Sequence, residues 1–339
     1  MKAQRLFLLC LAMLMLVGCT KETAVADTGA TVAVKPAEAE KVTQETIFKD
    51  AVEAEILAQE YEIVTEASEA AIPIILEPVA SGELVEANDS VIVDYSHTED
   101  GYVMVCFTAE TEKRLKVQVS GPTTTYTYNL IPGEWTVLPL SDGNGHYQVK
   151  VYQNVSGNQY SLVIGAQMDV NMLDEFVPFL GPNQYVNFAA SSVAVQKAQE
   201  LTKGIQDPLL KVEAIYNFAV SELEYDYDRA ATVKSGYIPV LDSVLEEKKG
   251  ICFDYAALMT GMLRSQGVPC KMVFGYAGST YHAWISVWTE DSGWVDGVIF
   301  FDGIAWKRLD PTFASTANES ESIMQYINNN SNYQEKYFY

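Results

Sequence analysis

Hydrophobic and polar positions alternate in short runs between residues 82 and 172. Gly, Pro, Asn and Asp separate these runs at spacings near ten residues. The runs are residues 90–96, 102–109, 115–121, 125–130, 135–141, 145–155 and 159–168. A period of two is typical of strands with one buried face, and frequent turns favour antiparallel pairing. The pattern predicts a small all-β sandwich over residues 82–172, with Cys106 buried in its core.

The hydrophobic period changes to that of helices from about residue 183. Three helices are predicted, over residues 191–204, 207–223 and 239–250, with Asp207-Pro208 as a start signal and Gly250 as a stop signal. A fourth predicted helix begins at Cys252 and ends at Gly267. Strand-like runs follow at residues 270–276, 282–289, 294–301 and 305–310. Helices followed by an antiparallel sheet predict an α+β arrangement.

The first residues have the pattern of an export signal. Lys2 and Arg5 precede an apolar run over residues 6–17, which is short for a membrane span. The run ends in Gly18-Cys19, which resembles the lipobox of bacterial lipoproteins. We therefore expect residues 1–18 to be a lipoprotein signal peptide and Cys19 to carry the lipid. The protein would then be extracytoplasmic and anchored to the cell membrane.

Two other segments lack a strong folding pattern. Residues 19–81 are predicted to be a tether, rich in Ala, Thr, Glu and Val, with a weak amphipathic helix over residues 46–70. Residues 316–339 form a Tyr- and Asn-rich tail. The sequence gives this tail no function, and a final helix packed on the core is one interpretation.

Charge and cysteine content narrow the classes of function. The formal charge is −23, and residues 1–18 contain two basic and no acidic residues. A chain this acidic is not expected to bind nucleic acid, and it would reach an anionic membrane through its lipid alone. Without residues 1–19 three cysteines remain, at no disulfide-framework spacing. The sequence contains no Cys-x-x-Cys, no His-x-x-x-His and no Gly-rich phosphate loop, so we expect neither a metal nor a cofactor.

Cys252 lies in the first turn of a predicted helix, where the positive helix end presents unpaired amides. A thiolate there is stabilised, and the same amides can donate to an oxyanion on an attacked carbonyl. His282 is the only histidine in the C-terminal half and could act as the base. Asp310 or Asp296 could orient its ring. Each residue taken alone also fits a structural role, and no spacing rule links them.

Several motifs, in one order, resemble the transglutaminase-like core of bacterial exported proteins. They are Gly250-x-Cys252 with Asp254-Tyr255-Ala256 after it, Leu263-Arg264-x-x-Gly267-Val268-Pro269, Gly275-Tyr276, His282-Ala283-Trp284, a tryptophan, and Asp310-Pro311-Thr312. Residues 225–228, Tyr-Asp-Tyr-Asp, are similar to the family's extended segment before its cysteine. The resemblance covers about residues 185–315, and we place the domain at residues 183–315.

The resemblance implies a papain-like fold with Cys252 as nucleophile, His282 as base and Asp310 as orienting acid. One departure is an extra hairpin between Trp294 and Trp306, which keeps Asp296 open as an alternative to Asp310. The family's second oxyanion donor has no certain match here. Tyr225, Tyr227 and Tyr237 are the candidates, and Tyr225 is favoured.

We therefore expect a thiol enzyme that transfers acyl groups from peptide or protein amides. Hydrolysis is favoured over amine cross-linking, and a cell-wall stem peptide is one candidate substrate. The alternative is a non-catalytic transglutaminase-like module that binds a partner at the cell surface. The sequence does not indicate an oligomeric state.

Overall fold

The computed structural model describes residues 75–290, 293–296, 298–301, 306–309 and 333–339. All of them belong to one compact unit, Ala67–Tyr339. The predicted signal peptide, the lipid site at Cys19, the helix over residues 46–70 and the candidate acid Asp310 lie outside the described residues.

Two antiparallel sheets form an all-β region between residues 85 and 170. The first has the strand order β1-β2-β3-β6, formed by Val85–Ala87, Val91–Asp94, Tyr102–Phe107 and Trp135–Pro139. The second has the order β5-β4-β7-β8, formed by Thr125–Leu130, Leu115–Ser120, Gly145–Ser156 and Gln159–Val170. Alternate residues of both sheets, such as Val103 and Val117, are fully buried in a shared core. The predicted β-sandwich is confirmed, and Cys106 is buried within it.

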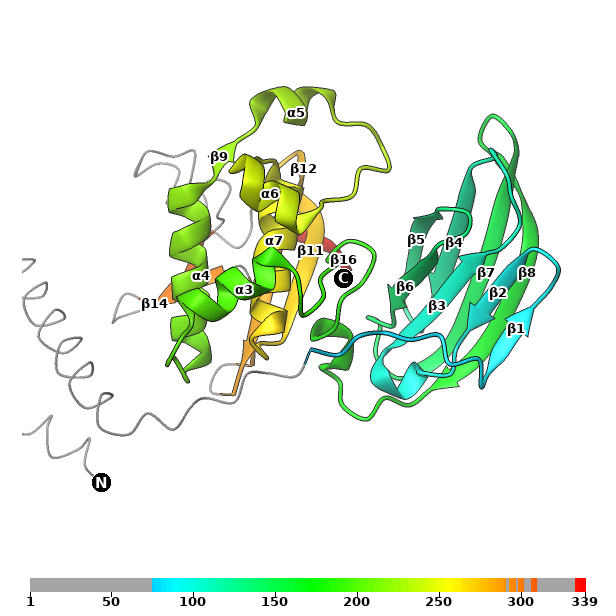
Figure 1. Cartoon of the computed structure of the whole chain (residues 1–339), viewed down its shortest axis with the longest axis horizontal. Coiled ribbons are helices and arrows are strands. Elements are labelled where there is room, and N and C mark those ends of the chain that lie inside the picture. The colour runs from blue at the N-terminus through cyan, green and yellow to red at the C-terminus, as the bar shows by residue number, and fades with distance from the viewer. Residues whose placement is uncertain (1–74, 291–292, 297, 302–305, 310–332) are drawn as a thin grey trace, which may run out of the picture. The chain divides into compact units, whose positions relative to one another are not determined.

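Helices precede a second sheet in the rest of the chain, which confirms the α+β fold. The helices are α3 (Val193–Leu201), α4 (Pro208–Glu222), α5 (Tyr227–Thr232), α6 (Leu241–Glu247) and α7 (Cys252–Ser265), and short 3-10 turns occur at Thr98–Asp100 (η1) and Val177–Phe179 (η2). Figure 1 shows α7 against β11 and β12, with α3, α4 and α6 also packed on it. Every α7 residue from Asp254 onward is buried, so α7 is the central helix of this fold.

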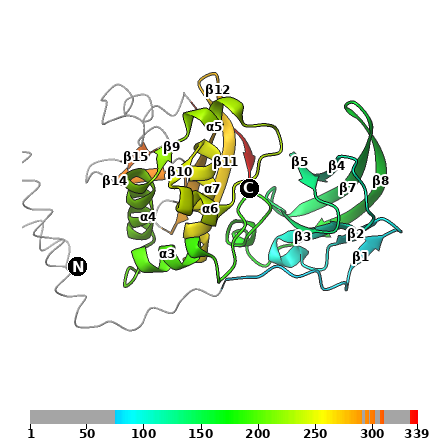
Figure 2. The same cartoon turned by 45° about the horizontal axis from the view of Figure 1, so that its top comes forward.

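The second sheet has the order β13-β12-β11-β16. Its strands are Gly293–Asp296, Thr280–Thr289, Cys270–Ala277 and Tyr333–Phe338. β14 (Val298–Phe301) and β15 (Trp306–Leu309) form a separate hairpin. β9 (Glu224–Tyr225) pairs in parallel with β10 (Lys249–Gly250), just before α7 (Figure 2). Residues 333–338 are thus a strand beside β11, and the interpretation of the tail as a helix is wrong there.

The start of α4 and the end of α7 agree with their sequence signals, whereas the end of α6 does not. The Asp207 carboxylate accepts hydrogen bonds from the amides of Leu209 and Leu210, which caps α4. Gly267 adopts a left-handed φ of 75° directly after the C-cap of α7. α6, however, stops at Glu247 with Lys248 at φ 51°, before the predicted stop at Gly250. The cause is the pairing of Lys249 and Gly250 with β9.

None of the helices in the described ranges is both long and apolar enough to cross a membrane.

Candidate active site

Cys252 is the first residue of α7 and is only partly buried. The chain enters α7 through β10, where Gly250 pairs with Tyr225. A side chain at position 250 would not fit, since its Cβ would lie 2.6 Å from the Cβ of Asp254. The glycine before the cysteine therefore allows β10 to turn tightly into the helix. This turn leaves the Cys252 thiol at the helix end that carries the unpaired amides.

His282 lies on β12, where it pairs with Gly275 of β11. Its side chain is 95% buried, and its ring stacks on Trp284 with the ring centroids 6.1 Å apart. Trp284 is itself almost fully buried. Gly275 has no side chain to compete for this space, since a Cβ there would lie 2.6 Å from the indole of Trp284. The Gly-Tyr and His-Ala-Trp motifs thus fix the histidine ring from two adjacent strands.

Cys252 and His282 line the same cleft, which we call the thiol cleft. Its volume is about 500 Å³, within the common range for ligand sites. The cleft walls come from β9, the segment after α5, the start of α7, and strands β11 and β12. The remaining lining residues are Tyr225, Ala230, Val233, Lys234, Ser235, Gly236, Tyr237, Ile251, Phe253, Phe274, Thr280 and Tyr281.

Asp254 is a buried carboxylate one turn into α7 and is not among the predicted site residues. It accepts hydrogen bonds from the Ile251 amide at 2.8 Å and the Tyr237 hydroxyl at 2.5 Å, and the Arg229 guanidinium lies 3.5 Å away. Burial raises the pKa of Asp254, while these three partners act in the opposite direction. The carboxylate therefore ties the segment between α5 and α6 to the start of α7.

A sequence signal for Asp254 did exist. A carboxylate at the third position of a helix commonly accepts the amide of the residue before the helix, as half of a capping box. Its contacts with Arg229 and Tyr237 could not be foreseen, because they depend on the path of residues 229–237 over the helix end.

The three tyrosines named as oxyanion donors lie in different surroundings. Tyr225 lines the thiol cleft and lies beside Gly250 through the β9–β10 pairing. Tyr227 is 66% exposed and is not among the residues that line the cleft. Tyr237 lines the cleft but donates its hydroxyl proton to Asp254. Tyr225 and Tyr237 thus line the thiol cleft, and Tyr227 does not.

Of the two candidate acids, Asp296 has a described backbone position and Asp310 does not. Asp296 pairs with Ser286, four residues along β12 from His282. Four strand residues span about 13 Å, so the register separates the backbone positions of Asp296 and His282 by about that distance along the sheet. Asp310, which lies outside the described residues, follows the last residue of β15. The register thus counts against Asp296 as the direct partner of His282.

Across the described part of the chain, no group of three or more His, Cys, Asp or Glu side chains is arranged to hold a metal ion. Cys106 and Cys270 are free and buried. Burial raises the pKa of Cys270 to about 11, with the nearby Arg264 acting in the opposite direction. Cys252 is therefore the most accessible of the three cysteines in the described residues.

Part of the chain matches a known protein superfamily. Residues 195–296 match the family model of the Transglutaminase-like superfamily. An uncharacterized protein of Mycobacterium leprae is 31% identical over 168 residues, which are 46% of this chain and 50% of that protein. The protein-glutamine gamma-glutamyltransferase of Pseudomonas aeruginosa is 28% identical over 113 residues, 29% of this chain and 16% of that protein. The chain thus spans at most half the length of these two relatives.

Among solved structures, a putative cysteine protease from Cytophaga hutchinsonii covers 70% of this chain and 76% of its own, with 15% identity and a TM-score of 0.34. The segment that matches the family model, residues 195–296, contains both Cys252 and His282, together with α7 and strands β11 and β12. Residues 195–296 of this chain are a transglutaminase-like superfamily domain.

Proposed function

We propose that this protein is a thiol enzyme that transfers the acyl group of a peptide or protein amide. Cys252 is the nucleophile, His282 the base and Asp310 the acid that orients the histidine. The observation that carries the proposal is the shared cleft, in which a cysteine at a helix N-terminus lies with a histidine from the neighbouring sheet. The family match over residues 195–296 supports the same conclusion.

In the first step the Cys252 sulfur forms a bond to the carbonyl carbon of the amide, and the carbonyl electrons move to oxygen. Amides at the start of α7 donate to this oxyanion, and Tyr225 is placed to assist. His282 has taken the thiol proton and returns it to the amide nitrogen as the carbon–nitrogen bond breaks. The products are a free amine and a thioester on Cys252.

In the second step water or a second amine attacks the thioester. His282 removes a proton from the attacking group and returns it to sulfur as the carbon–sulfur bond breaks. Water gives hydrolysis, and an amine gives a cross-link. We favour hydrolysis, since Tyr281 lines the thiol cleft and is itself exposed, so water can reach this part of the cleft wall.

One experiment separates these chemistries. The mature protein is incubated with casein, with casein plus a fluorescent primary amine, and with purified cell-wall fragments. New amino termini or released amine indicate hydrolysis, and fluorescent casein indicates cross-linking. Cys252→Ala should abolish either product, whereas the buried Cys106→Ala should retain it. Activity that survives Cys252→Ala would refute the proposed nucleophile.

A non-catalytic binding module is the second candidate, and thiol labelling discriminates it. Iodoacetamide should alkylate the wild type quickly at pH 6, because a thiolate paired with imidazolium reacts where an ordinary thiol does not. Cys252→Ser should remove the signal. Burial raises the pKa of Cys106, so Cys106→Ser should leave the signal unchanged. Slow labelling at pH 6 that rises only near pH 9 would favour the binding module.

We also propose that Cys19 carries a lipid after removal of residues 1–18, which anchors the enzyme outside the cytoplasm. The motif Gly18-Cys19 after a short apolar run supports this. Expression in a bacterium fed an alkyne-bearing fatty acid should label the wild type, and Cys19→Ala should be unlabelled and released from membranes. Equal labelling of both forms would overturn the anchor.

A further inference from the structure

A second cleft adjoins the thiol cleft and is lined in part by the β-sandwich. We call it the aromatic cleft; its volume is about 290 Å³. It shares Ser235, Gly236, Tyr237, Phe253, Phe274 and Tyr281 with the thiol cleft. Because these residues line both, the two clefts lie next to each other, within reach of a single bound peptide.

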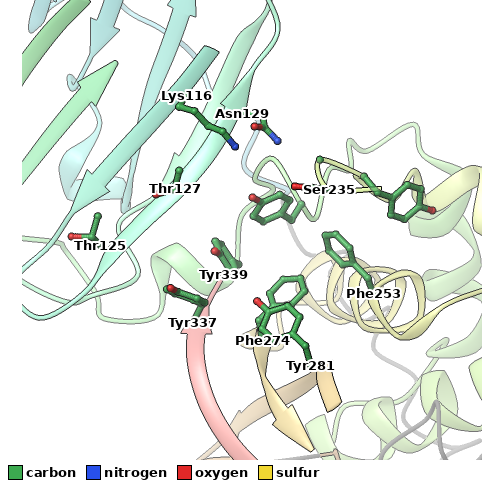
Figure 3. A pocket seen from close by; sticks show the side chains of 13 residues that line it. Lys116, Thr125, Thr127, Asn129, Ser235, Phe253, Phe274, Tyr281, Tyr337 and Tyr339 are labelled. Atoms are coloured by element: carbon green, nitrogen blue, oxygen red, sulfur yellow. The ribbon is translucent and has the colours of Figure 1, made fainter. Parts of the chain in front are cut away.

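The two sides of the aromatic cleft differ in chemistry, as Figure 3 shows. One side is built of rings from α7 and the second sheet, such as Phe253, Phe274 and Tyr281. The other side comes from β4 and β5 of the sandwich and presents Lys116, Thr127 and Asn129. Rings offer apolar contact to a side chain or a peptide plane, and the hydroxyl and amide groups can bond to a peptide backbone.

Among the described residues that line this cleft, Lys116 is the charged one. Its side chain extends from β4 toward the rings (Figure 3) and is partly buried. Within the described residues it has no hydrogen-bond or ion-pair partner. Burial lowers the pKa of Lys116, with the neighbouring Arg114 acting in the same direction. A partly buried lysine without a partner is costly unless it meets an anion in the working state of the protein.

The described residues that line the two clefts carry a charge opposite in sign to that of the whole chain. The formal charge of the protein is −23, yet no Asp or Glu lines either cleft in the described residues. Lys116 and Lys234 do line them. A cleft of this kind attracts a negatively charged ligand that the rest of the surface repels.

We propose that the aromatic cleft is a specificity subsite for an acidic peptide, in which Lys116 pairs with a carboxylate side chain that flanks the reacting amide. This proposal rests on the proposed acyl transfer, because that reaction defines which amide of the peptide reacts. The sandwich thereby takes part in substrate choice, and a β-domain with no chemistry of its own contributes the charge that selects the substrate.

A binding experiment on a chemically inactive protein tests the subsite. In the Cys252→Ala background, rhodamine-labelled eleven-residue peptides with a central Gln in a neutral sequence are titrated at low salt. A single Glu is moved through the flanking positions, and the matching Gln peptide is the reference. Glu at one or two positions should tighten binding about tenfold, and higher salt should reduce this preference.

Lys116→Met should remove the Glu preference and leave the neutral peptides within about twofold. Lys150→Met is the matched control, since Lys150 lies on the neighbouring strand β7, is partly buried in the same way, and does not line either cleft. It should retain the preference. Equal melting temperatures of the two variants exclude misfolding as the cause.

The proposal is overturned if no position prefers Glu, if the preference survives Lys116→Met, or if wall glycan but no acidic peptide binds. Binding in the Cys252→Ala background needs no catalysis. Failure of the acyl-transfer proposal would therefore show in the activity assay alone, and failure of the subsite in this titration alone.

Discussion

At the scale of single residues, Asp254 decides how the start of α7 is held. It is fully buried and has three partners, from Ile251, Tyr237 and Arg229. Arg229 also pairs with Glu247 at 2.6 Å, so the contacts of one carboxylate extend from α7 to α5 and α6. The wall of the thiol cleft formed by residues 233–237 depends on this arrangement.

Asp254→Asn should lower the free energy of unfolding by about 1–3 kcal/mol, because the neutral amide cannot satisfy all three donors and leaves Arg229 without this charge partner. Urea denaturation followed by circular dichroism measures the change. Asp228→Asn, on the exposed first turn of α5, is the control and should stay within about 0.5 kcal/mol. Equal effects of the two variants would contradict the role of Asp254.

The same variant has a defined pH dependence. Burial raises the pKa of Asp254 in the folded state, so the folded protein holds this proton more tightly than the unfolded chain. That contribution to stability is complete below the unfolded pKa and is lost as the pH rises through the folded pKa. The stability difference between wild type and Asp254→Asn should therefore shrink as the pH rises from the unfolded pKa, about 4, through the raised folded pKa. A difference that grows over this interval would be evidence against the raised pKa.

Gly275 is a second residue with a predictable role, as the cross-strand neighbour of His282. Gly275→Ala should cost about 2 kcal/mol or more, because the new Cβ would overlap the Gln334 carbonyl of β16 and lie 2.6 Å from Trp284. Gly165→Ala on β8 is the matched control, since its Cβ would meet Lys150 at an ordinary 3.7 Å. Unfolding curves of the two variants are compared. Equal stabilities would show that β16 and Trp284 adjust freely.

At the scale of elements, Arg264 of α7 connects three segments that are distant in sequence. Its guanidinium is buried and donates to the carbonyl oxygens of Cys270 at 2.9 Å, Gly181 at 2.7 Å and Tyr339 at 2.6 Å. Tyr339 also exchanges two backbone hydrogen bonds with Met272. The helix thereby holds the end of β16 against β11 through a side chain as well as through the sheet.

Arg264→Leu should destabilise the protein by about 3 kcal/mol or more, because three backbone oxygens, those of Cys270 and Tyr339 being buried, lose a charged donor. Hydrogen exchange should quicken in β16 before it quickens in β12. Arg114→Leu is the control: Arg114 is exposed, donates to the Gly157 carbonyl, and should cost about 1 kcal/mol or less. Unchanged exchange in β16 would mean that the sheet alone holds this strand.

The elements with local signals could be predicted from the sequence. The seven alternating runs became β2 to β8, and Asp207, Cys252 and Gly267 mark helix ends as expected. Each of these signals lies within a few residues of the element that it specifies, so tertiary contacts were not needed to interpret it.

The features that escaped prediction depend on contacts between distant segments. The strand at residues 333–338 forms because β11 offers a free edge, and its own sequence carries many polar residues. α6 ends early because β10 pairs with β9. The aromatic cleft has residues from positions 116 to 339, and no short window of sequence could indicate it.

At the scale of the whole molecule, a cluster of tyrosines joins the sandwich to the transglutaminase-like domain. Tyr126 and Tyr128 of β5 contact the ring of Tyr339 at 5.4 and 5.6 Å between centroids, both edge-on. Tyr185 contacts Tyr128 and Tyr339 as well. Edge-on aromatic pairs of this kind each contribute about 0.5–1.5 kcal/mol beyond the burial of their area.

Tyr128→Phe should keep these ring contacts and be neutral or slightly stabilising, because the Tyr128 hydroxyl is buried with no hydrogen-bond partner in the described residues. Tyr147→Phe is the matched variant, and its hydroxyl bonds to the Leu140 and Gly143 carbonyls and the Asp142 amide. It should cost about 1–2 kcal/mol. Melting temperatures of the two variants provide the comparison, and a larger loss for Tyr128→Phe would reveal a partner for its hydroxyl.

The position of β16 has a consequence for biosynthesis. While a ribosome has not yet made residues 333–339, the edge of β11 stays uncovered, and the Tyr337 and Tyr339 side of the aromatic cleft does not exist. A nascent chain at that stage can fold its sandwich, whose strands are all N-terminal to residue 171. Its second sheet, however, remains a target for chaperones and for unwanted strand pairing until translation has passed β16.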